Sequence, residues 1–185
     1  DVMEYDVLIV GGGPAGLYFS ISMKLLDPSC EVVVLERNKP DDTFGWGVVL
    51  SDETLENLQA NDAASAATIR KNFAYWDDIA LHFKGQRLVS TGHGFCGIGR
   101  KKLLLILQER ARALGVDLRY ETEVQSAETY RNDYDVVVAN DGLNSTARML
   151  YEDTFKPAID ERLCQFVWLG THQTFKDAFT FIFEE

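Results

Sequence analysis

The stretch from Tyr5 to Gly16 limits the fold of this chain more than any other part of the sequence. It contains four consecutive apolar residues, Val7 to Val10, without the spacing of a helix, as in a strand buried on both faces of a parallel sheet. A glycine-rich turn follows, and the residues from Leu17 to Leu26 then predict a helix that ends before Asp27-Pro28. We therefore expect a central strand joined to a helix by a glycine-rich turn.

The glycines of this turn fit the pattern G-x-G-x-x-G, which suits the binding of phosphate. Gly11 would permit the sharp turn out of the strand, and Gly13 would let the backbone approach a pyrophosphate. Gly16 would let the helix pack closely on the strand, while free N–H groups at the helix start would face the anion. Taken alone, the pattern also fits a glycine-rich turn without a ligand.

A second buried strand supports a dinucleotide site. The residues from Glu31 to Glu36 place an apolar run between two carboxylates, and Glu36 lies 20 positions after Gly16. A carboxylate at about this spacing receives ribose hydroxyls in dinucleotide-binding folds. The two strands and the turn between them therefore predict an α/β fold with a Rossmann-like parallel sheet.

Composition argues against several functional classes. The chain has 185 residues, of which 46% are hydrophobic, and its net charge of −11 opposes nucleic-acid binding, which needs clustered Lys and Arg. No stretch approaches the roughly 20 apolar residues of a membrane span, and no signal peptide precedes the first strand, so a cytoplasmic protein is expected. Cys30, Cys96 and Cys164 lie far apart, which predicts buried thiols and no metal site.

Two regions predict a second sheet. Apolar residues alternate with polar ones from Ile79 to Lys84, and a turn at Gly85-Gln86 leads into Arg87 to Thr91, which is typical of a β-hairpin. The stretches from Leu163 to Thr171 and from Ala178 to Phe183 read as strands that extend the sheet of this hairpin. A hairpin within a parallel α/β pattern indicates an inserted antiparallel sheet.

Other elements follow from local signals. Ser51 predicts the cap of a helix through Ala60, and a leucine-rich face predicts a helix from Gly99 that stops at Gly115. The remaining expected elements are a short helix at Asp62 to Phe73, strands at Val116 to Tyr120 and Tyr134 to Ala139, and Glu121 to Val124 continuing or pairing with the first of these strands.

One segment, Thr43 to Leu50, leaves two interpretations open. Its glycines flank Trp46, which suits a backbone packed against a flat ligand. A buried connecting strand would explain the same residues. The pattern alone does not choose between them.

Three separated motifs resemble a known family. They are G-G-G-P-A-G at residues 11–16 with Glu36-Arg37, G-R-K-K-L at 99–103, and D-G-L-N-S-T-A-R at 141–148. Together they resemble the FAD-dependent aromatic hydroxylases, the single-component flavoprotein monooxygenases typified by para-hydroxybenzoate hydroxylase. G-W-G-V-V-L-S-D at 45–52, H-G-F-C-G-I-G-R-K at 93–101 and V-W-L-G-T-H at 167–172 look like the branch that contains salicylyl-CoA hydroxylase and 2-aminobenzoyl-CoA monooxygenase.

The resemblance implies a domain arrangement. Residues 1–73 and 97–158 would form a discontinuous, Rossmann-like FAD-binding domain with a parallel sheet. Residues 74–96 and 159–185 would form the start of an inserted antiparallel substrate-domain sheet. This family carries further elements after the position of Glu185, so we expect the chain to be the N-terminal portion of a hydroxylase whose C-terminal half completes the site.

The resemblance also implies which residues hold FAD. Glu36 would bind the adenosine ribose and Arg37 would lie beside the adenine, while Arg100 and Val124 would flank the adenosine half. The pyrophosphate would lie on Gly11, Gly13, Pro14, Ala15 and Gly16. The isoalloxazine would be lined by Gly45, Trp46, Gly47 and Val48.

Three residues of the last motif would serve both the flavin pyrophosphate and a passing nicotinamide nucleotide. These are Asp141, Gly142 and Arg148. Without the resemblance, Asp141-Gly142 would read as a plain turn and Arg148 as a surface residue of a helix.

In this family NADH or NADPH reduces the flavin, and one atom of molecular oxygen is transferred to an electron-rich ring. The resemblance therefore implies an NAD(P)H-dependent FAD monooxygenase that hydroxylates an aromatic acid, most specifically its CoA thioester. The cofactor supplies the difficult chemistry, so no catalytic residue is assigned and no metal is expected. Of the histidines, His93 is the first to consider, because the adjacent Gly94-Phe95 should pass near the flavin.

Two other functions stay open. A flavin reductase or dehydrogenase of the same fold would bind FAD without inserting oxygen into a product. A non-catalytic dinucleotide-fold module would keep the architecture without redox turnover. The acidic chain must also accommodate an anionic thioester. Basic residues of the C-terminal half are one source of the positive charge that this needs, and the dense basic group Arg100-Lys101-Lys102 also reads as a solvated helix face.

Overall fold

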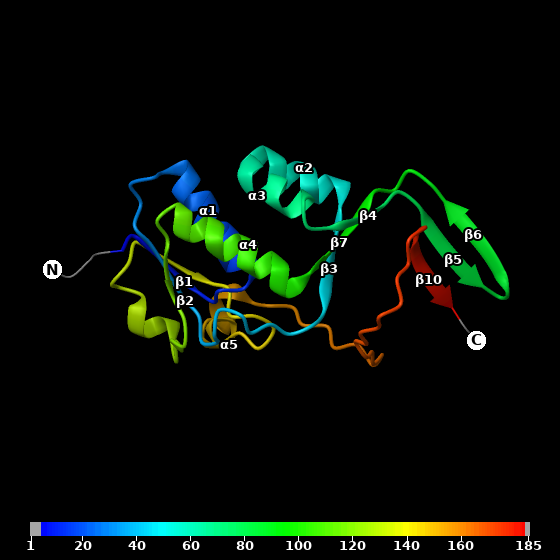
Figure 1. The fold of residues 1–185 in the computed structure, drawn as a ribbon. Coiled ribbons are helices and arrows are strands. Elements are labelled where there is room, and N and C mark those ends of the chain that lie inside the picture. Colours follow the sequence, from blue (N-terminus) through cyan, green and yellow to red (C-terminus); the bar gives the residue numbers. More distant parts are fainter. Residues whose placement is uncertain (1–4, 184–185) are drawn as a thin grey trace. The chain divides into compact units, whose positions relative to one another are not determined.

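The computed structural model describes residues 5–183, which fold into two compact units (Figure 1). Within this range, the first unit contains the residues up to Asp42 and from Leu104 to Phe166, and the second contains Thr43 to Leu103 and the residues from Val167 onward. The predicted domain boundaries stay a prediction, since compactness does not show which ligand a unit serves. Residues 1–4 and 184–185, which those predicted domains include, lie outside the described residues.

The first unit is built on a parallel sheet in the strand order β8, β2, β1, β9. Val7 lies opposite Val32 of β2 on one side and opposite Val136 of β9 on the other, so β1 is internal to the sheet. The α/β fold, its parallel sheet and the internal first strand are therefore confirmed. The strands are β1 (Val7–Val10), β2 (Val32–Leu35), β8 (Asp117–Arg119) and β9 (Val136–Ala139).

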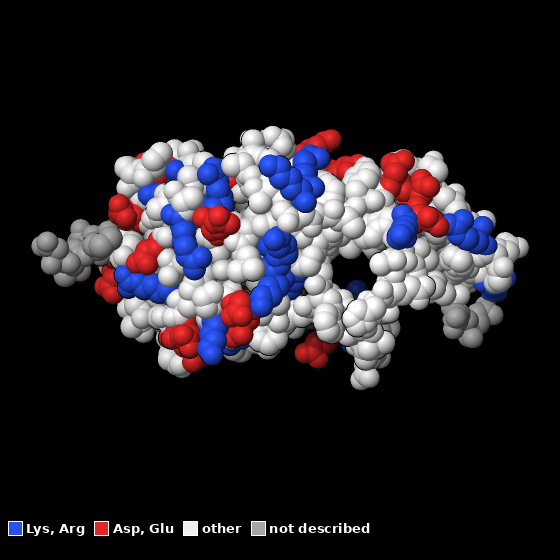
Figure 2. Space-filling view, in the orientation of Figure 1, with Lys and Arg blue, Asp and Glu red and all other residues white. Residues whose placement is uncertain are grey.

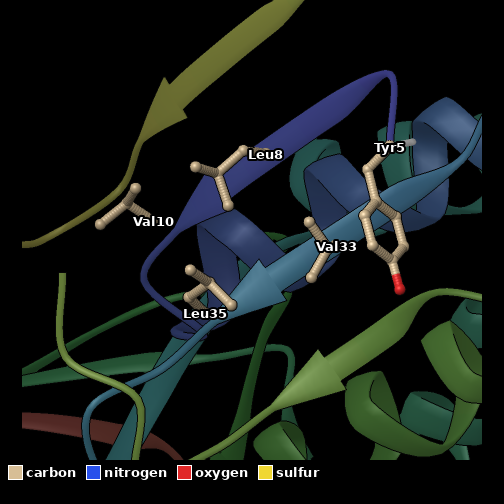
Figure 3. Close-up of a cluster of buried hydrophobic side chains, with 5 residues drawn as sticks. All are labelled: Tyr5, Leu8, Val10, Val33 and Leu35. Atoms are coloured by element: carbon tan, nitrogen blue, oxygen red, sulfur yellow. The ribbon is translucent and has the colours of Figure 1, made fainter. Parts of the chain in front are cut away.

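Every residue of β1 and β2 is buried, as expected for strands covered on both faces. Side chains alternate along a strand, so each face of the sheet receives its own set. Helix α1 (Pro14–Leu26) packs on β1 and β2, where Gly16 faces the side chain of Ile9. The cluster drawn in Figure 3 consists of Tyr5, Leu8, Val10, Val33 and Leu35.

Helix α1 begins at Pro14 rather than at the predicted Leu17, because proline fits the first turn of a helix, where its missing N–H is not needed. Near its end, Lys24 is buried and donates hydrogen bonds from Nζ to the carbonyls of Pro28 and Cys30, both at 2.8 Å. The lysine thus fastens the end of α1 to the turn that leads into β2.

Helix α4 (Arg100–Ala113) agrees with the predicted helix and its stop. Gly115 follows with φ +88°, a left-handed conformation that suits glycine at a helix end. The predicted apolar face includes the buried residues Leu103, Leu104, Leu107 and Ala111. The part of α4 from Leu104 onward belongs to the first unit. This unit also contains the short helices η1 (Ala127–Tyr130), α5 (Thr146–Leu150) and α6 (Glu152–Phe155).

The second unit contains an antiparallel sheet in the order β3, β7, β4 and a pair of helices. Ser51 accepts a hydrogen bond from the Thr54 N–H at 3.3 Å, which confirms the predicted helix cap. Strands β4 and β7 were not predicted. The elements are β3 (Gly47–Ser51), α2 (Asp52–Asn61), α3 (Ala63–Arg70), β4 (Ala74–Trp76) and β7 (Phe95–Gly99).

A further sheet of the second unit confirms the predicted hairpin. Strands β5 (Ile79–Phe83) and β6 (Gln86–Ser90) pair antiparallel, and the turn between them has positive φ at Lys84 and Gly85. Strand β10 (Phe179–Phe183) extends this sheet as predicted, but it pairs parallel to β5. The inserted sheet is therefore mixed.

Three sequence expectations are wrong. The stretch from Leu163 to Thr171 forms no strand, and Leu163 is 99% exposed, because alternation of apolar residues makes a strand only where a neighbouring strand pairs with it. Glu121 to Val124 leaves the sheet at Glu121, whose φ is +51°. Cys164 is exposed, whereas Cys30 and Cys96 are buried as predicted, and burial raises the pKa of both thiols.

The surface of the first unit carries both signs of charge. On the face that Figure 2 displays, Lys and Arg side chains are interspersed with Asp and Glu side chains. No helix within residues 5–183 combines the length and apolar character needed to cross a membrane.

We predict that Leu8→Ala in the full-length protein lowers the free energy of unfolding by about 2–5 kcal/mol, because the truncation leaves a cavity in the buried cluster that Leu8 shares with Val10 and Val33. Leu8 is 0% exposed, whereas Leu26, at the end of α1, is 82% exposed. Leu26→Ala is therefore the matched control and should change the unfolding free energy by less than about 1 kcal/mol. Denaturant unfolding checks this, and equal effects of the two substitutions would contradict the assigned core.

Candidate cofactor site

The glycine-rich turn follows β1 at the carboxyl end of the sheet. A Cβ at Gly11, where φ is +105°, would collide with the carbonyl of Asn140 at the end of β9. A Cβ at Gly16 would collide with the carbonyl of Gly11 and approach the Ile9 side chain. Both glycines are therefore required by the packing of the protein itself.

Gly13 differs from these two glycines, because a Cβ there would have no heavy atom within 4 Å. Gly13 is the N-cap of α1 and makes no side-chain cap hydrogen bond, with Pro14 in the first turn. The N–H groups of Ala15 and Gly16 lie in that first turn, where a helix supplies no acceptor of its own. The turn therefore offers open space and free donors to an anion, as in other phosphate-binding helix N-termini.

Glu36 ties this turn to the end of β2. Its Oε2 accepts a hydrogen bond from the Gly12 N–H at 2.7 Å, and its Oε1 accepts one from the Asn38 N–H at 2.8 Å. A carboxylate has about four acceptor positions, so two hydrogen bonds leave capacity for ribose hydroxyls. Glu36 is thus held in place by the backbone and can still receive a ligand.

Gly12 and Asn140 belong to this region but were not predicted. A Cβ at Gly12 would lie 2.9 Å from the Cβ of Glu36, so this glycine is needed for the contact with the carboxylate. The run of three glycines before Pro14 was the available signal for Gly12. No sequence signal pointed to Asn140, whose N–H donates to the Val10 carbonyl at 2.7 Å.

Asp141 caps helix α5. Its Oδ2 accepts hydrogen bonds from the N–H groups of Thr146 at 2.9 Å and Ala147 at 3.2 Å. Burial acts to raise the pKa of Asp141, but hydrogen bonds from Ser145 and from the backbone of Ala147 and Thr146 outweigh it, so the pKa is lowered. The carboxylate is therefore charged and organises the loop of the last motif.

Arg148 closes the same loop from the other end. Its side chain donates from Nη2 to the Leu143 carbonyl at 2.5 Å, while Nε is buried without a hydrogen-bond partner in the part of the chain that is described. Gly142 has φ +87°, and a Cβ there would meet open space. The loop is thus self-supporting and keeps one buried donor unused.

Arg37 and Val124 complete the predicted residues of the first unit. Arg37 is exposed, while Val124 is half-buried and packs against the buried cluster that contains Leu8 of β1 and Val33 of β2. Val124 therefore contributes to the core of the first unit.

The other predicted residues belong to the second unit, where the structure brings them together. The Arg100 N–H donates to the Trp46 carbonyl at 3.1 Å, and Gly47 and Val48 pair with β7 at the start of β3. Gly45 has φ +92°, and Trp46 is exposed. Arg100 Nε is buried without a hydrogen-bond partner among the described residues.

His93 lies in the turn between β6 and β7 and is exposed. Its Nε2 forms a 2.5 Å hydrogen bond with Oγ of Ser90, and its N–H donates to the Asp77 carbonyl at 3.0 Å. Both contacts hold the turn, so they give His93 a structural role. Residues 5–183 contain no group of three or more His, Cys, Asp or Glu side chains that could hold a metal ion.

The sequence matches a family described as "FAD binding domain" over residues 4–152. The chain belongs to this FAD-binding domain family. The residues fit the cofactor, because the open space at Gly13, the uncapped start of α1 and the unused acceptors of Glu36 suit a dinucleotide. The predicted cofactor, FAD, is confirmed.

Curated relatives of this FAD-binding domain include oxygenases. The chain is 43% identical over 179 residues to salicyloyl-CoA 5-hydroxylase of a Streptomyces species, covering 97% of this chain and 34% of the relative. It is 31% identical over 172 residues to protodeoxyviolaceinate monooxygenase of Chromobacterium violaceum, covering 91% of this chain and 46% of the relative. The chain thus spans less than half the length of either relative, and the predicted resemblance to FAD-dependent aromatic hydroxylases is confirmed.

A solved structure shares the fold. The tetrameric form of 2-methyl-3-hydroxypyridine-5-carboxylic acid oxygenase superposes with a TM-score of 0.69 at 24% sequence identity, covering 80% of this chain and 42% of that one. The predicted fold class, a Rossmann-like FAD-binding domain with the start of an inserted sheet, is confirmed.

We predict that Gly13→Ala and Gly16→Ala act differently in the full-length protein. Gly16→Ala should lower the free energy of unfolding by about 1–3 kcal/mol, because its Cβ meets backbone. Gly13→Ala should lower the free energy of unfolding by at most about 1 kcal/mol, because alanine is a poorer N-cap. It should nevertheless weaken the free energy of FAD binding by at least the same amount. Thermal unfolding without FAD and titration with FAD check both statements, and unchanged FAD affinity in Gly13→Ala would contradict the phosphate site.

We predict a pH-dependent contribution from Asp141. Its folded-state pKa is lowered, so its stabilising effect is complete above the ordinary aspartate pKa of about 4 and is lost as the pH falls through the folded value. Asp141→Ala should therefore lower the free energy of unfolding by about 1 kcal/mol at pH 7, a typical cap contribution, and by less in acid.

The control for this prediction is Asp141→Asn, whose amide oxygen also accepts hydrogen bonds from α5 but does not titrate. It should lose less stability than Asp141→Ala. The difference between the two variants should be independent of pH, because neither titrates at position 141. Urea unfolding between neutral and acid pH measures the differences. A constant gap between Asp141→Ala and the unsubstituted protein at every pH would show that the charge of Asp141 contributes nothing.

Proposed function

We propose that this chain is the FAD-binding part of an NAD(P)H-dependent monooxygenase that hydroxylates an aromatic acid as its CoA thioester. The observation that carries the proposal is the 43% identity, over 97% of the chain, to a protein named as a hydroxylase of salicyloyl-CoA. The more distant relative is also named as a monooxygenase, although of a different aromatic compound. Oxygen insertion is therefore the reaction that the relatives share, and the CoA thioester is the more specific part of the proposal.

We propose that the first unit holds the adenosine and pyrophosphate parts of FAD. Free donors at the start of α1 support a pyrophosphate on Gly11, Gly13, Pro14, Ala15 and Gly16. The ordered carboxylate of Glu36 supports a ribose there, with the exposed Arg37 beside the adenine and Val124 at the adenosine half. Two of these roles use groups that have no partner filling them within the described residues: the N–H donors that follow Gly13 and the remaining acceptor positions of the Glu36 carboxylate.

The loop from Asp141 to Arg148 is proposed for the flavin pyrophosphate and for the approach of the nicotinamide nucleotide. The unused Nε of Arg148 supports this role, because a buried donor is costly unless an acceptor satisfies it. Gly142, with open space around its Cα, allows a ligand to come close to the backbone.

In the second unit, Gly45, Trp46, Gly47 and Val48 are proposed to line the isoalloxazine ring, with Arg100 beside the cofactor. When bound, FAD supplies the redox chemistry, accepting a hydride from NAD(P)H and activating oxygen. The residues of this chain bind and orient it and limit access of water. Neither the histidines nor any other side chain is assigned a proton-transfer step.

We propose that residues 1–73 and 97–158 form the FAD-binding domain and that 74–96 and 159–185 belong to the substrate domain. We further infer that other residues of a longer protein complete the substrate site. The exposed aromatic side chains of Phe181 and Phe183 on β10 support this, since exposed apolar surfaces often mark contacts with other segments. A cytoplasmic location is proposed with the same function, because NAD(P)H and CoA thioesters are found there.

The experiment is to assay the full-length protein with FAD and NADH or NADPH, comparing benzoate-type acids with their CoA thioesters under isotopically labelled oxygen. We expect the thioester to stimulate NAD(P)H oxidation at least ~10-fold over the free acid, the scale of discrimination that additional binding contacts provide. The product should gain one labelled oxygen atom.

The competing functions give different results in this assay. Oxidation of NAD(P)H without labelled product would indicate a reductase or dehydrogenase. A protein that binds no FAD would indicate a non-catalytic module and overturn the proposal. Equal turnover of free acid and thioester would retain the monooxygenase and reject the CoA-linked substrate.

A further inference from the structure

Two tryptophans of the second unit pack against each other's neighbouring glycines. A Cβ at Gly45 would lie 2.9 Å from Cζ3 of Trp168, and a Cβ at Gly170 would lie 3.1 Å from Cε2 of Trp46. Each indole therefore contacts main-chain atoms at a position where any residue other than glycine would place a Cβ too close to the ring. We call these four residues, Gly45, Trp46, Trp168 and Gly170, the tryptophan clasp.

The clasp joins two segments that are 122 residues apart in the sequence. The indole Nε1 of Trp46 donates a hydrogen bond to the main-chain carbonyl of Trp168 at 3.4 Å. The main-chain carbonyl of Trp46 in turn accepts the Arg100 N–H at the start of α4, at 3.1 Å. Trp46 is thus held through its side chain by the distant segment and through its backbone by the helix.

Hydrophobic burial alone does not explain these contacts. Trp46 is 65% exposed and Trp168 is 59% exposed, so each indole turns much of its surface to solvent. Ordering two such side chains costs conformational entropy, and a core contribution would bury them more fully. The contact instead falls on Gly45, whose φ of +92° is a left-handed conformation that favours glycine.

The segment held by the clasp is the one to which the isoalloxazine was assigned above. We propose that Trp168 is a positioning residue for this segment: its ring, resting on Gly45, sets the path of the chain from Phe44 to Gly47 and thereby the surface offered to the flavin ring. The inference rests on the proposed function for the flavin contact, while the clasp itself is independent of it. This proposal gives a role to Trp168 of the V-W-L-G-T-H motif, a motif to which no role was assigned above.

A double-mutant cycle in the full-length protein tests the contact. Gly45→Ala introduces backbone strain at φ +92° and a collision with Trp168, whereas in a Trp168→Ala background only the strain is left. The two substitutions should therefore be non-additive in the unfolding midpoint, with Gly45→Ala costing less when Trp168 is absent. Gly170→Ala with Trp46→Ala gives the reciprocal cycle.

Flavin binding tests the positioning role with measurements other than activity. Trp168→Ala should change the visible circular dichroism of bound FAD and raise its Kd roughly tenfold, because the binding segment is no longer preorganised. Trp168→Phe keeps an aromatic ring over Gly45 and the same main-chain acceptor for Trp46, so it should restore most of both. If Trp168→Ala does not fold, Trp168→Leu takes its place.

The matched control is Trp76→Ala. Trp76 lies in the same unit, and its Nε1 also donates to a main-chain carbonyl, that of Phe175, at 2.9 Å. Its ring likewise lies against a glycine, Gly97, where a Cβ would be 3.0 Å from Cζ3. This substitution should lower stability without changing the flavin spectrum or the Kd.

The outcomes separate the inference from the proposed function. Unchanged flavin spectrum and Kd in Trp168→Ala, with FAD bound, would overturn the positioning role and leave the proposed function standing. Additive effects in the cycle would overturn the clasp itself. Failure of the unsubstituted protein to bind FAD would overturn the proposed function, and with it the flavin role of the clasp, even if the cycle shows coupling.

Discussion

The close approach of α1 to β1 is the constraint on which the rest of the first unit depends. Gly16 sits against the carbonyl of Gly11, and Gly11 sits against the carbonyl of Asn140, so helix, turn and β9 share one set of backbone contacts. Any side chain at these two positions would push the elements apart. Because the elements touch there, the start of α1 and the carboxylate of Glu36 come to the same end of the sheet, where we propose that the pyrophosphate and ribose of the cofactor bind.

Glycine serves a second purpose in the other unit, where it makes room for tryptophan. The chain has three tryptophans, and each rests on a glycine: Trp46 on Gly170, Trp76 on Gly97 and Trp168 on Gly45. Large flat side chains can contact backbone only where a Cβ is absent. This packing orders strands and loops that have few buried residues, and it accounts for glycines that would otherwise weaken a strand.

Sequence patterns predicted elements well where the signal was local. The runs of β1 and β2, the cap at Ser51 and the turn of the 79–91 hairpin all depend on neighbouring residues, and all are confirmed. β7 escaped prediction because its glycines break any alternation, and it is a strand only through pairing with β3 and β4. The stretch from Leu163 to Thr171 shows the converse, since its alternation has no strand beside it.

The sequence by itself determined the parallel α/β core, the glycine-rich turn, the carboxylate at Glu36 and, through its motifs, the family. These follow from residues close together in the chain or from a pattern shared with relatives. Only the tertiary structure decided that Gly12 and Asn140 lie at the proposed site, that Asp141 caps α5, and that Trp46 and Trp168 meet. The contacts of Gly12, Asn140 and the two tryptophans join residues distant in the sequence, which no local spacing records. The cap by Asp141 depends on the path of the loop between Asp141 and Thr146.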